Sequence, residues 1–189
     1  MFKAMVFIGL SVAIGLSPLF SDAAIVLGNP NANMTLTEVY DYQCPHCRAE
    51  LATLETLERQ CPQIKFRSMP VALLNPTSLV EASSVYAVAL THQHVAQLNH
   101  AYFADVIETP KGAMELLNRF GLLTSKFIMT MHSQVVADQL LEGLNLLRQY
   151  HANGVPLIII KNDNHLIAVY RGETPLSILQ QEISHVATH

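Results

Sequence analysis

The stretch DYQCPHCRAE, residues 41–50, places Cys44 and Cys47 around a proline and a histidine. A cysteine pair with this spacing can be a redox couple, half of a metal site or a small structural staple. A strand-sized run of β-branched and aromatic residues, 34–42, precedes the pair, and leucines at helical spacing follow it over 48–60. The cysteines are therefore expected at the junction between a strand and a helix.

The rest of the chain extends this unit on both sides of a helical block. Residues 64–69 alternate apolar and polar as a second strand, which completes a β-α-β unit. From Pro76 to Ala152 the apolar period becomes helical, and four or five helices are expected. Two strands and a last helix follow at 154–160, 165–170 and 176–186. This order predicts one α/β domain, residues 24–189, with an all-helical insertion at about 76–152.

Length and composition limit the functions that are possible. The chain has 189 residues, of which 50% are hydrophobic and 14% are charged, so one folded domain is expected. The net charge is −4, and no acidic or basic runs are present. A nucleic-acid partner is therefore excluded at this stage.

The N-terminus is typical of a signal peptide for export. Lys3 gives a positive start, residues 4–16 are apolar, and small residues precede an expected cleavage site before Ala24. The apolar run is shorter than the roughly 20 residues that span a bilayer, which argues against an anchor. Export places the cysteines in an oxidising compartment, where disulfides persist. Because the mature chain holds only three cysteines, at least one thiol is spare or reactive.

The position of Cys44 favours its thiolate over its thiol. The start of a helix leaves backbone N–H groups without helical partners and carries the positive end of the helix dipole. His46 can donate a hydrogen bond or add positive charge beside Cys44, and Pro45 suits the first helical turn. A stable thiolate is a good leaving group, so a Cys44–Cys47 disulfide would be oxidising. Cys47, one turn further along, would be the resolving partner.

Other uses of the cysteines are less well supported. Attachment of a c-type haem needs a histidine directly after the second cysteine, where this chain has Arg48. Zinc needs four ligands, and Cys44, Cys47 and Cys61 supply three. A structural staple within one helical turn would remove little chain entropy. Cys61 is expected to be a buried or half-buried free thiol, with pairing to another chain as the alternative. No metal and no cofactor are expected.

With these features together, the sequence resembles the DsbA family of periplasmic thiol-disulfide oxidoreductases. The matching features are the CPHC motif behind a strand, a helical block of similar size, and Gly154, Val155 and Pro156 before the strand LIII. The resemblance implies an α/β thioredoxin fold with an inserted all-helical subdomain and a location in the periplasm. The segment DYQC, residues 41–44, resembles one subgroup of this family more than its phenylalanine-rich members.

The resemblance also assigns roles to particular residues. It implies a cis peptide bond at Pro156 and contact of Val155 and Pro156 with bound peptide. It places a buried acid at Glu38, and strand parity puts Glu38 on one face with Leu36 and Tyr40. Glu38 is thus expected to be buried with a raised pKa and to relay protons to Cys47, the alternative being an exposed edge residue.

The function expected is a dithiol oxidase that donates the Cys44–Cys47 disulfide to reduced or unfolded secreted proteins. The resemblance implies reoxidation by a quinone-linked membrane protein. Little chain precedes the first expected strand, which favours a monomer over the dimeric isomerases of the subgroup. A disulfide isomerase or reductase, or a thiol-based metal-binding module, remains the alternative.

Overall fold

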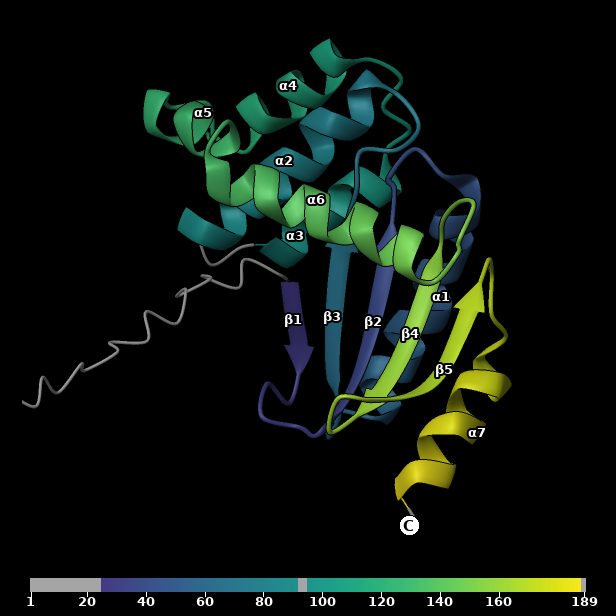
Figure 1. The fold of residues 1–189 in the computed structure, drawn as a ribbon. Coiled ribbons are helices and arrows are strands. Elements are labelled where there is room, and N and C mark those ends of the chain that lie inside the picture. Colours follow the sequence, from purple (N-terminus) through teal and green to yellow (C-terminus); the bar gives the residue numbers. More distant parts are fainter. Residues whose placement is uncertain (1–24, 92–94, 188–189) are drawn as a thin grey trace, which may run out of the picture.

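The described part of the chain forms one five-stranded mixed sheet (Figure 1). The computed structural model describes residues 25–91 and 95–187, so the predicted signal peptide, 1–23, lies outside it. The strand order is β1-β3-β2-β4-β5; β2 and β3 are parallel, and the other neighbouring pairs are antiparallel. The strands are β1 (Ile25–Gly28), β2 (Met34–Tyr40), β3 (Lys65–Pro70), β4 (Leu157–Asn162) and β5 (His165–Arg171).

Helices pack on both faces of this sheet. The helices α1 (Pro45–Gln60) and α7 (Leu176–Ala187) cover one face and bury Leu36, Ile158 and Ile160. On the other face α6 (Gln134–Gln149) packs over Leu157 and Ile159. The remaining helices form a block beyond one end of the sheet (Figure 1). They are α2 (Pro76–Thr91), α3 (Val95–Ala104), α4 (Pro110–Arg119) and α5 (Ser125–Met131).

The predicted α/β fold with a helical insertion is confirmed. The helices α2 to α6 lie between β3 and β4, within the predicted range 76–152. The helix after the first cysteine begins at Pro45, three residues earlier than the leucine spacing alone suggested. Within the described residues, no helix is both long and apolar enough to cross a membrane.

The strand β1 was missed in the sequence. Its four residues are too few for a recognisable alternation, so the first strand was placed at residue 34. In the structure β1 pairs with the otherwise open edge of β3, so tertiary pairing decides its conformation. Gly28 closes this strand with φ +70°, and a Cβ there would lie 2.3 Å from the carbonyl oxygen of Ile64. Glycine is required by both the backbone angle and this close approach.

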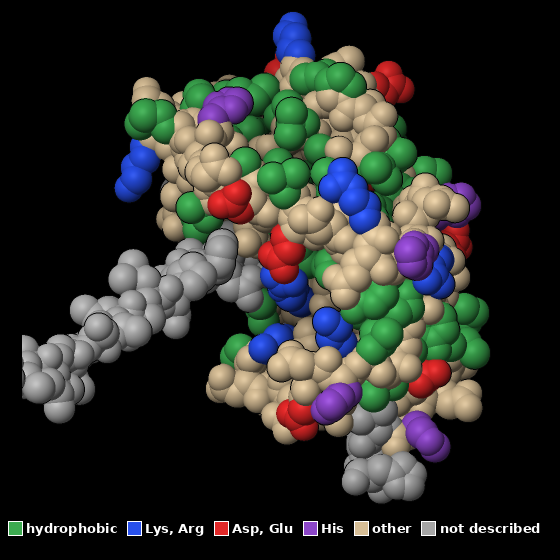
Figure 2. Space-filling view, in the orientation of Figure 1, with side chains coloured by type: hydrophobic (Ala, Val, Ile, Leu, Met, Phe, Trp, Pro, Cys, Tyr) green, Lys and Arg blue, Asp and Glu red, His purple; other side chains and the backbone are tan. Residues whose placement is uncertain are grey.

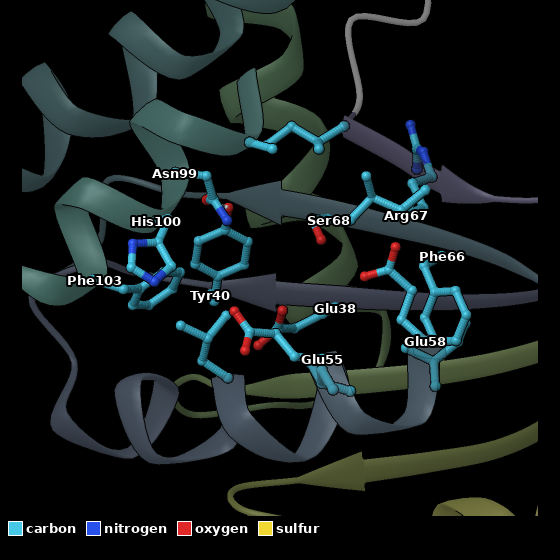
Figure 3. A pocket seen from close by; sticks show the side chains of 16 residues that line it. Glu38, Tyr40, Glu55, Glu58, Phe66, Arg67, Ser68, Asn99, His100 and Phe103 are labelled. Atoms are coloured by element: carbon cyan, nitrogen blue, oxygen red, sulfur yellow. Dashed lines mark hydrogen bonds between the residues drawn. The ribbon is translucent and has the colours of Figure 1, made fainter. Parts of the chain in front are cut away.

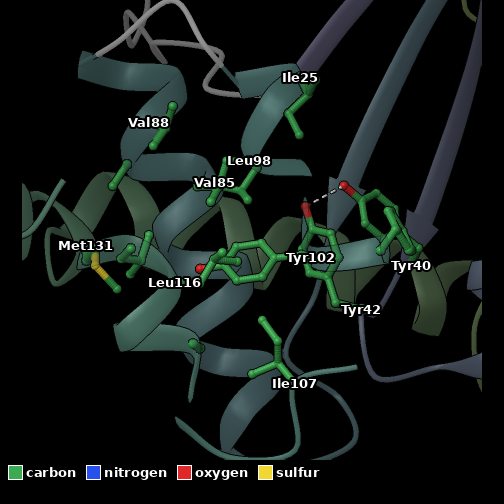
Figure 4. Close-up of a cluster of buried hydrophobic side chains, with 14 of the residues drawn as sticks. Ile25, Tyr40, Tyr42, Val85, Val88, Leu98, Tyr102, Ile107, Leu116 and Met131 are labelled. Atoms are coloured by element: carbon green, nitrogen blue, oxygen red, sulfur yellow. Dashed lines mark hydrogen bonds between the residues drawn. The ribbon is translucent and has the colours of Figure 1, made fainter. Parts of the chain in front are cut away.

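An aromatic cluster joins the end of β2 to the helical block (Figure 4). The rings of Tyr40 and Tyr42 lie 5.3 and 4.8 Å from that of Phe103 on α3, centroid to centroid. Both tyrosine hydroxyls donate to the Oδ1 atom of Asn99, at 2.8 and 2.5 Å. This cluster fixes the chain segment that enters the CPHC turn.

Candidate active site

Cys44 caps the start of α1 in an extended conformation, and Pro45 occupies the first helical turn. No side-chain oxygen caps this helix, so its first N–H groups remain available to an anionic sulfur. Cys44 is 5% exposed, and its thiol donates to the carbonyl oxygen of Val155 at 3.4 Å. The first cysteine therefore lies at the helix start predicted from the sequence.

Cys47 lies one turn further along and is fully buried. Burial is the main cause that raises the pKa of its thiol, and nearby Cys44 and Glu38 raise that pKa further. Both cysteines are free thiols in this structure. Both cysteines are buried, but Cys44 keeps a small exposed surface and Cys47 keeps none, which fits an attacked sulfur at Cys44 and an internal partner at Cys47.

His46 lies on the surface rather than against the sulfur of Cys44. Its side chain is 68% exposed, and its Nδ1 atom pairs with a carboxylate oxygen of Glu173, in the loop between β5 and α7. Among the described contacts, the hydrogen bond of His46 goes to Glu173 and not to Cys44. His46 was expected to donate a hydrogen bond or add positive charge beside Cys44, but its hydrogen bond goes instead to Glu173.

Glu38 is buried on β2, with 5% of its surface exposed. Burial, followed by the nearby carboxylate of Glu50, raises the pKa of Glu38 to about 8. Glu38 lines a cavity of about 270 Å³ between the sheet, α1 and α3 (Figure 3). The expectation of a buried acid with a raised pKa is therefore confirmed. The charged or titratable residues that share the cavity are Tyr40, Glu55, Glu58, Arg67 and His100.

The segment before β4 closes the site opposite Cys44. The peptide bond between Val155 and Pro156 is cis, as the resemblance implied. Pro156 is buried, whereas Val155 is partly exposed and presents its carbonyl oxygen to Cys44. The structure therefore brings Cys44, Val155 and Pro156 together from positions more than 100 residues apart.

Comparison with known proteins shows to which family the chain belongs. The family model described as thioredoxin matches residues 21–172, a range that contains both cysteines and Pro156. The chain belongs to the thioredoxin family. It is similar to the thiol:disulfide interchange protein DsbA of Burkholderia cepacia, at 24% identity over 152 residues that cover 77% of this chain and 71% of that protein.

Solved structures of this kind share the fold over most of the chain. A thioredoxin-like oxidoreductase from Silicibacter pomeroyi DSS-3 superposes with a TM-score of 0.79 at 23% identity, covering 90% of this chain and 96% of that one. The thiol-disulfide exchange protein alpha-DsbA2 from Wolbachia pipientis gives 0.75 at 20% identity, covering 88% and 89%. The predicted thioredoxin fold and the resemblance to DsbA proteins are confirmed.

The buried carboxylate of Asp41 orders the CPHC turn. This residue was missed in the sequence analysis. Asp41 is fully buried. Its Oδ1 atom accepts from the backbone N–H of Gln43, and its Oδ2 atom accepts from those of Leu73 and Leu74, all within 3.0 Å. Asp41 therefore ties the turn to the loop after β3. A sequence signal existed, because aspartate commonly bonds the backbone two residues further on.

A second missed carboxylate ties the turn to the helical block. The side-chain amide of Gln43 donates to both carboxylate oxygens of Glu81 on α2 and to the carbonyl oxygen of Ile107. Burial is the main cause that raises the pKa of Glu81 to about 7, and nearby Asp41 adds to it. Glu81 is the acid within the apolar run LVEASSVYAVA, a pattern that predicts a buried charge.

The third cysteine and the metal alternative can also be placed. Cys61 lies at the C-terminal end of α1, partly buried, and Cys44 lies at the opposite end of that helix. Burial raises the pKa of the Cys61 thiol. Within residues 25–91 and 95–187, no group of three or more His, Cys, Asp or Glu side chains is placed to hold a metal ion. The three cysteines therefore do not form one ligand set.

Proposed function

We propose that this protein donates a Cys44–Cys47 disulfide to cysteine pairs of exported proteins. The observation that carries the proposal is the difference between the two sulfurs. Cys44 lies at the uncapped start of α1 beside the partly exposed Val155, whereas Cys47 is fully buried behind it. The names of two relatives, a thiol:disulfide interchange protein and a thiol-disulfide exchange protein, agree with this chemistry.

The exchange takes two steps. A client thiolate attacks the sulfur of Cys44; a client–Cys44 disulfide forms, and the Cys44–Cys47 bond breaks with its electron pair on Cys47. Glu38, which is protonated at neutral pH because its pKa is about 8, supplies the proton that Cys47 takes up. A second client thiolate then attacks the bonded client sulfur and releases Cys44 as a thiolate. Two electrons pass from the client to the protein.

In this second step the Cys44 thiolate is a better leaving group than the client sulfur to which it is bonded. The free N–H groups and the positive end of α1 stabilise an anion at the N-cap position, and Pro45 holds the turn that begins the helix. His46 lies on the same turn, and any positive charge on its ring stabilises the same anion. A leaving group stabilised in this way drives release of an oxidised client.

The client is held by the segment before β4. The backbone of Val155, with Pro156 behind it, offers polar groups beside Cys44 to an extended peptide. Apolar client residues would fit a groove between the loop after β3 and α6, where Figure 2 shows hydrophobic side chains at the surface. The apolar residues that line the groove include Leu73, Leu74, Leu79, Leu140 and Leu141.

The cellular setting follows from the same proposal. Residues 1–23 would direct export to the periplasm, and the mature protein would act as a monomer. A quinone-linked membrane protein would remove the two electrons and restore the disulfide. No cofactor within the protein takes part in these steps.

Transfer to a reduced model protein tests the proposal. The oxidised protein carries Cys61→Ser, so that only one cysteine pair remains. It is mixed with a reduced client protein of known disulfides, and the free thiols of the client are counted over time. We expect the client to lose two thiols for each protein molecule that becomes reduced. Failure of this transfer, together with a Cys44–Cys47 pair found reduced in the exported protein, would favour an isomerase or reductase instead.

A further inference from the structure

Glu50 is a buried acid on α1 that the exchange steps above do not use. It is 2% exposed and follows Cys47 by three residues, on the buried stripe of α1 that continues through Leu54 and Leu57. A carboxylate is almost never this buried unless it is paired. Its position directly behind the reactive pair therefore needs a physical reason.

The two carboxylate oxygens of Glu50 have different surroundings. The Oε2 atom accepts from the backbone N–H of Thr174 at 2.7 Å, whereas Oε1 is buried without a hydrogen-bond partner. Thr174 lies in the loop between β5 and α7, next to Glu173, which pairs with His46. A backbone N–H donor stabilises the ionised form of a carboxyl group. Burial is the main cause that raises the pKa of Glu50; the N–H of Thr174 opposes this rise, and Glu173 of the same loop adds to it.

Glu38 faces this charge from β2. It has no comparable backbone donor among the described contacts, and its Oε1 atom is also buried without a partner. Negative charge on Glu50 adds to burial in raising the pKa of Glu38. Two buried carboxyl groups whose charges interact do not both ionise readily. The N–H of Thr174 opposes the rise in the pKa of Glu50, and no such donor among the described residues opposes the rise for Glu38, so Glu50 ionises more readily and Glu38 keeps the proton.

We propose that Glu50 is a positioning residue that keeps a proton on Glu38, so that Glu38 can pass it to Cys47 when the disulfide opens. The inference rests on the proposed function, since it refines the first exchange step. In that step a thiolate sulfur bonds to Cys44, the Cys44–Cys47 bond breaks, and the electron pair leaves on Cys47. The proton comes from Glu38, which regains one from solvent.

Other charged groups surround the two acids and stay in place when Glu50 is changed. Glu173 faces Glu50 from the loop after β5 and opposes its ionisation. Cys47 faces Glu38 from α1. The groups that share the cavity with Glu38 are Tyr40 of β2, Glu55 and Glu58 of α1, Arg67 of β3 and His100 of α3. Because these groups are common to parent and variant, the comparison isolates the charge of Glu50.

The test is the pH dependence of disulfide opening by a small monothiol. Single-turnover rates are divided by the concentration of the attacking thiolate at each pH. The parent rate should fall as pH rises through the pKa of Glu38, about 8. In Glu50→Gln the repulsion is lost, so Glu38 gives up its proton more easily and the fall should move to lower pH. Glutamine still offers a carbonyl oxygen to the N–H of Thr174.

Three further variants make the result decisive. Glu38→Gln should open slowly without the alkaline fall, and adding Glu50→Gln to it should change nothing more. Glu115→Gln, the same change in charge at an exposed site on α4, should superimpose on the parent. A Glu50→Gln profile that coincides with the parent, or a shift that persists without Glu38, would overturn the proposal.

The assay separates this inference from the proposed function. It follows opening of the disulfide by a small thiol and involves no protein client. A protein that fails to oxidise clients but shows the Glu50-dependent shift would lose the donor role and keep the inference. Normal client oxidation with no shift would do the reverse.

Discussion

Cys47→Ala is expected to accumulate a mixed disulfide on Cys44, whereas Cys44→Ala should form almost none. Reduced variants, each in a Cys61→Ser background, are incubated with oxidised glutathione and weighed by intact-protein mass spectrometry. In Cys47→Ala the thiolate at the start of α1 attacks glutathione disulfide, and no second thiol is present to release the adduct. The adduct should therefore approach one glutathione per protein.

The contrast between the two variants depends on burial. Cys47 is fully buried and its thiol pKa is raised, so its sulfur is inaccessible and mostly protonated. The glutathione adduct on Cys47 in Cys44→Ala should form at least about tenfold more slowly than the adduct on Cys44 in Cys47→Ala. Equal adduct formation in the two variants would contradict the assignment of Cys44 as the exchanging sulfur. The parent pair should show no lasting adduct, because Cys47 resolves it.

Glu38→Gln is expected to stabilise the protein at neutral pH. The pKa of Glu38 is about 8 in the folded chain against 4.5 for the ordinary group. An acid whose pKa is raised in the folded chain contributes fully to the free energy of unfolding below pH 4.5. This contribution is lost as the pH rises to about 8. By neutral pH this loss is about 3 kcal/mol, since each pKa unit is worth about 1.4 kcal/mol. Glutamine does not ionise and removes the loss.

Urea unfolding followed by circular dichroism, repeated across this pH range, measures the difference. The variant and the parent should be similar near pH 4.5 and diverge in favour of the variant as pH rises. Glu115→Gln, on the surface of α4, should follow the parent. Parallel curves for parent and Glu38→Gln would mean that Glu38 ionises in the folded protein as it does in water. The gain in stability should accompany slower disulfide opening.

The sequence was enough to predict that the CPHC segment begins a helix and to predict the order of most elements. Alternation and helical spacing are local signals, and they located β2 to β5 and the helical insertion within a few residues. The position of Cys44 at the start of α1 follows from that order alone. By contrast β1 is too short to give such a signal, and only its pairing with β3 defines it.

The surface of α6 shows what a local pattern leaves open. The run LLEGLNLL, residues 140–147, places leucines on more than one side of this helix. Leu147 and Gly143 are buried, but Leu141 is 50% exposed and lines the apolar groove. More than one helix face is leucine-rich, and periodicity alone does not say which face meets the sheet. Leu144 and Leu146 are partly buried against the same core as Leu147, so most leucines of the run face the core and Leu141 is the exception.

The carboxylates around the cysteines could be predicted only in part. Glu38 was found through strand parity and the resemblance, and its burial is confirmed. Glu50 shares the buried stripe of α1 with Cys47. Helical spacing from Cys47 was therefore enough to predict that Glu50 is buried. The partners of Asp41 and Glu81 come from distant loops and helices. Local spacing does not encode such partners.

The direction of electron flow is the central claim, and equilibrium with glutathione measures it most directly. The Cys61→Ser protein is equilibrated with mixtures of reduced and oxidised glutathione, quenched with acid, and its Cys44–Cys47 state is read by alkylation and mass. We predict that the Cys44–Cys47 pair is largely reduced in a mixture with equal concentrations of reduced and oxidised glutathione, as expected for a couple more oxidising than glutathione. A pair that stays oxidised in an excess of reduced glutathione would contradict the account.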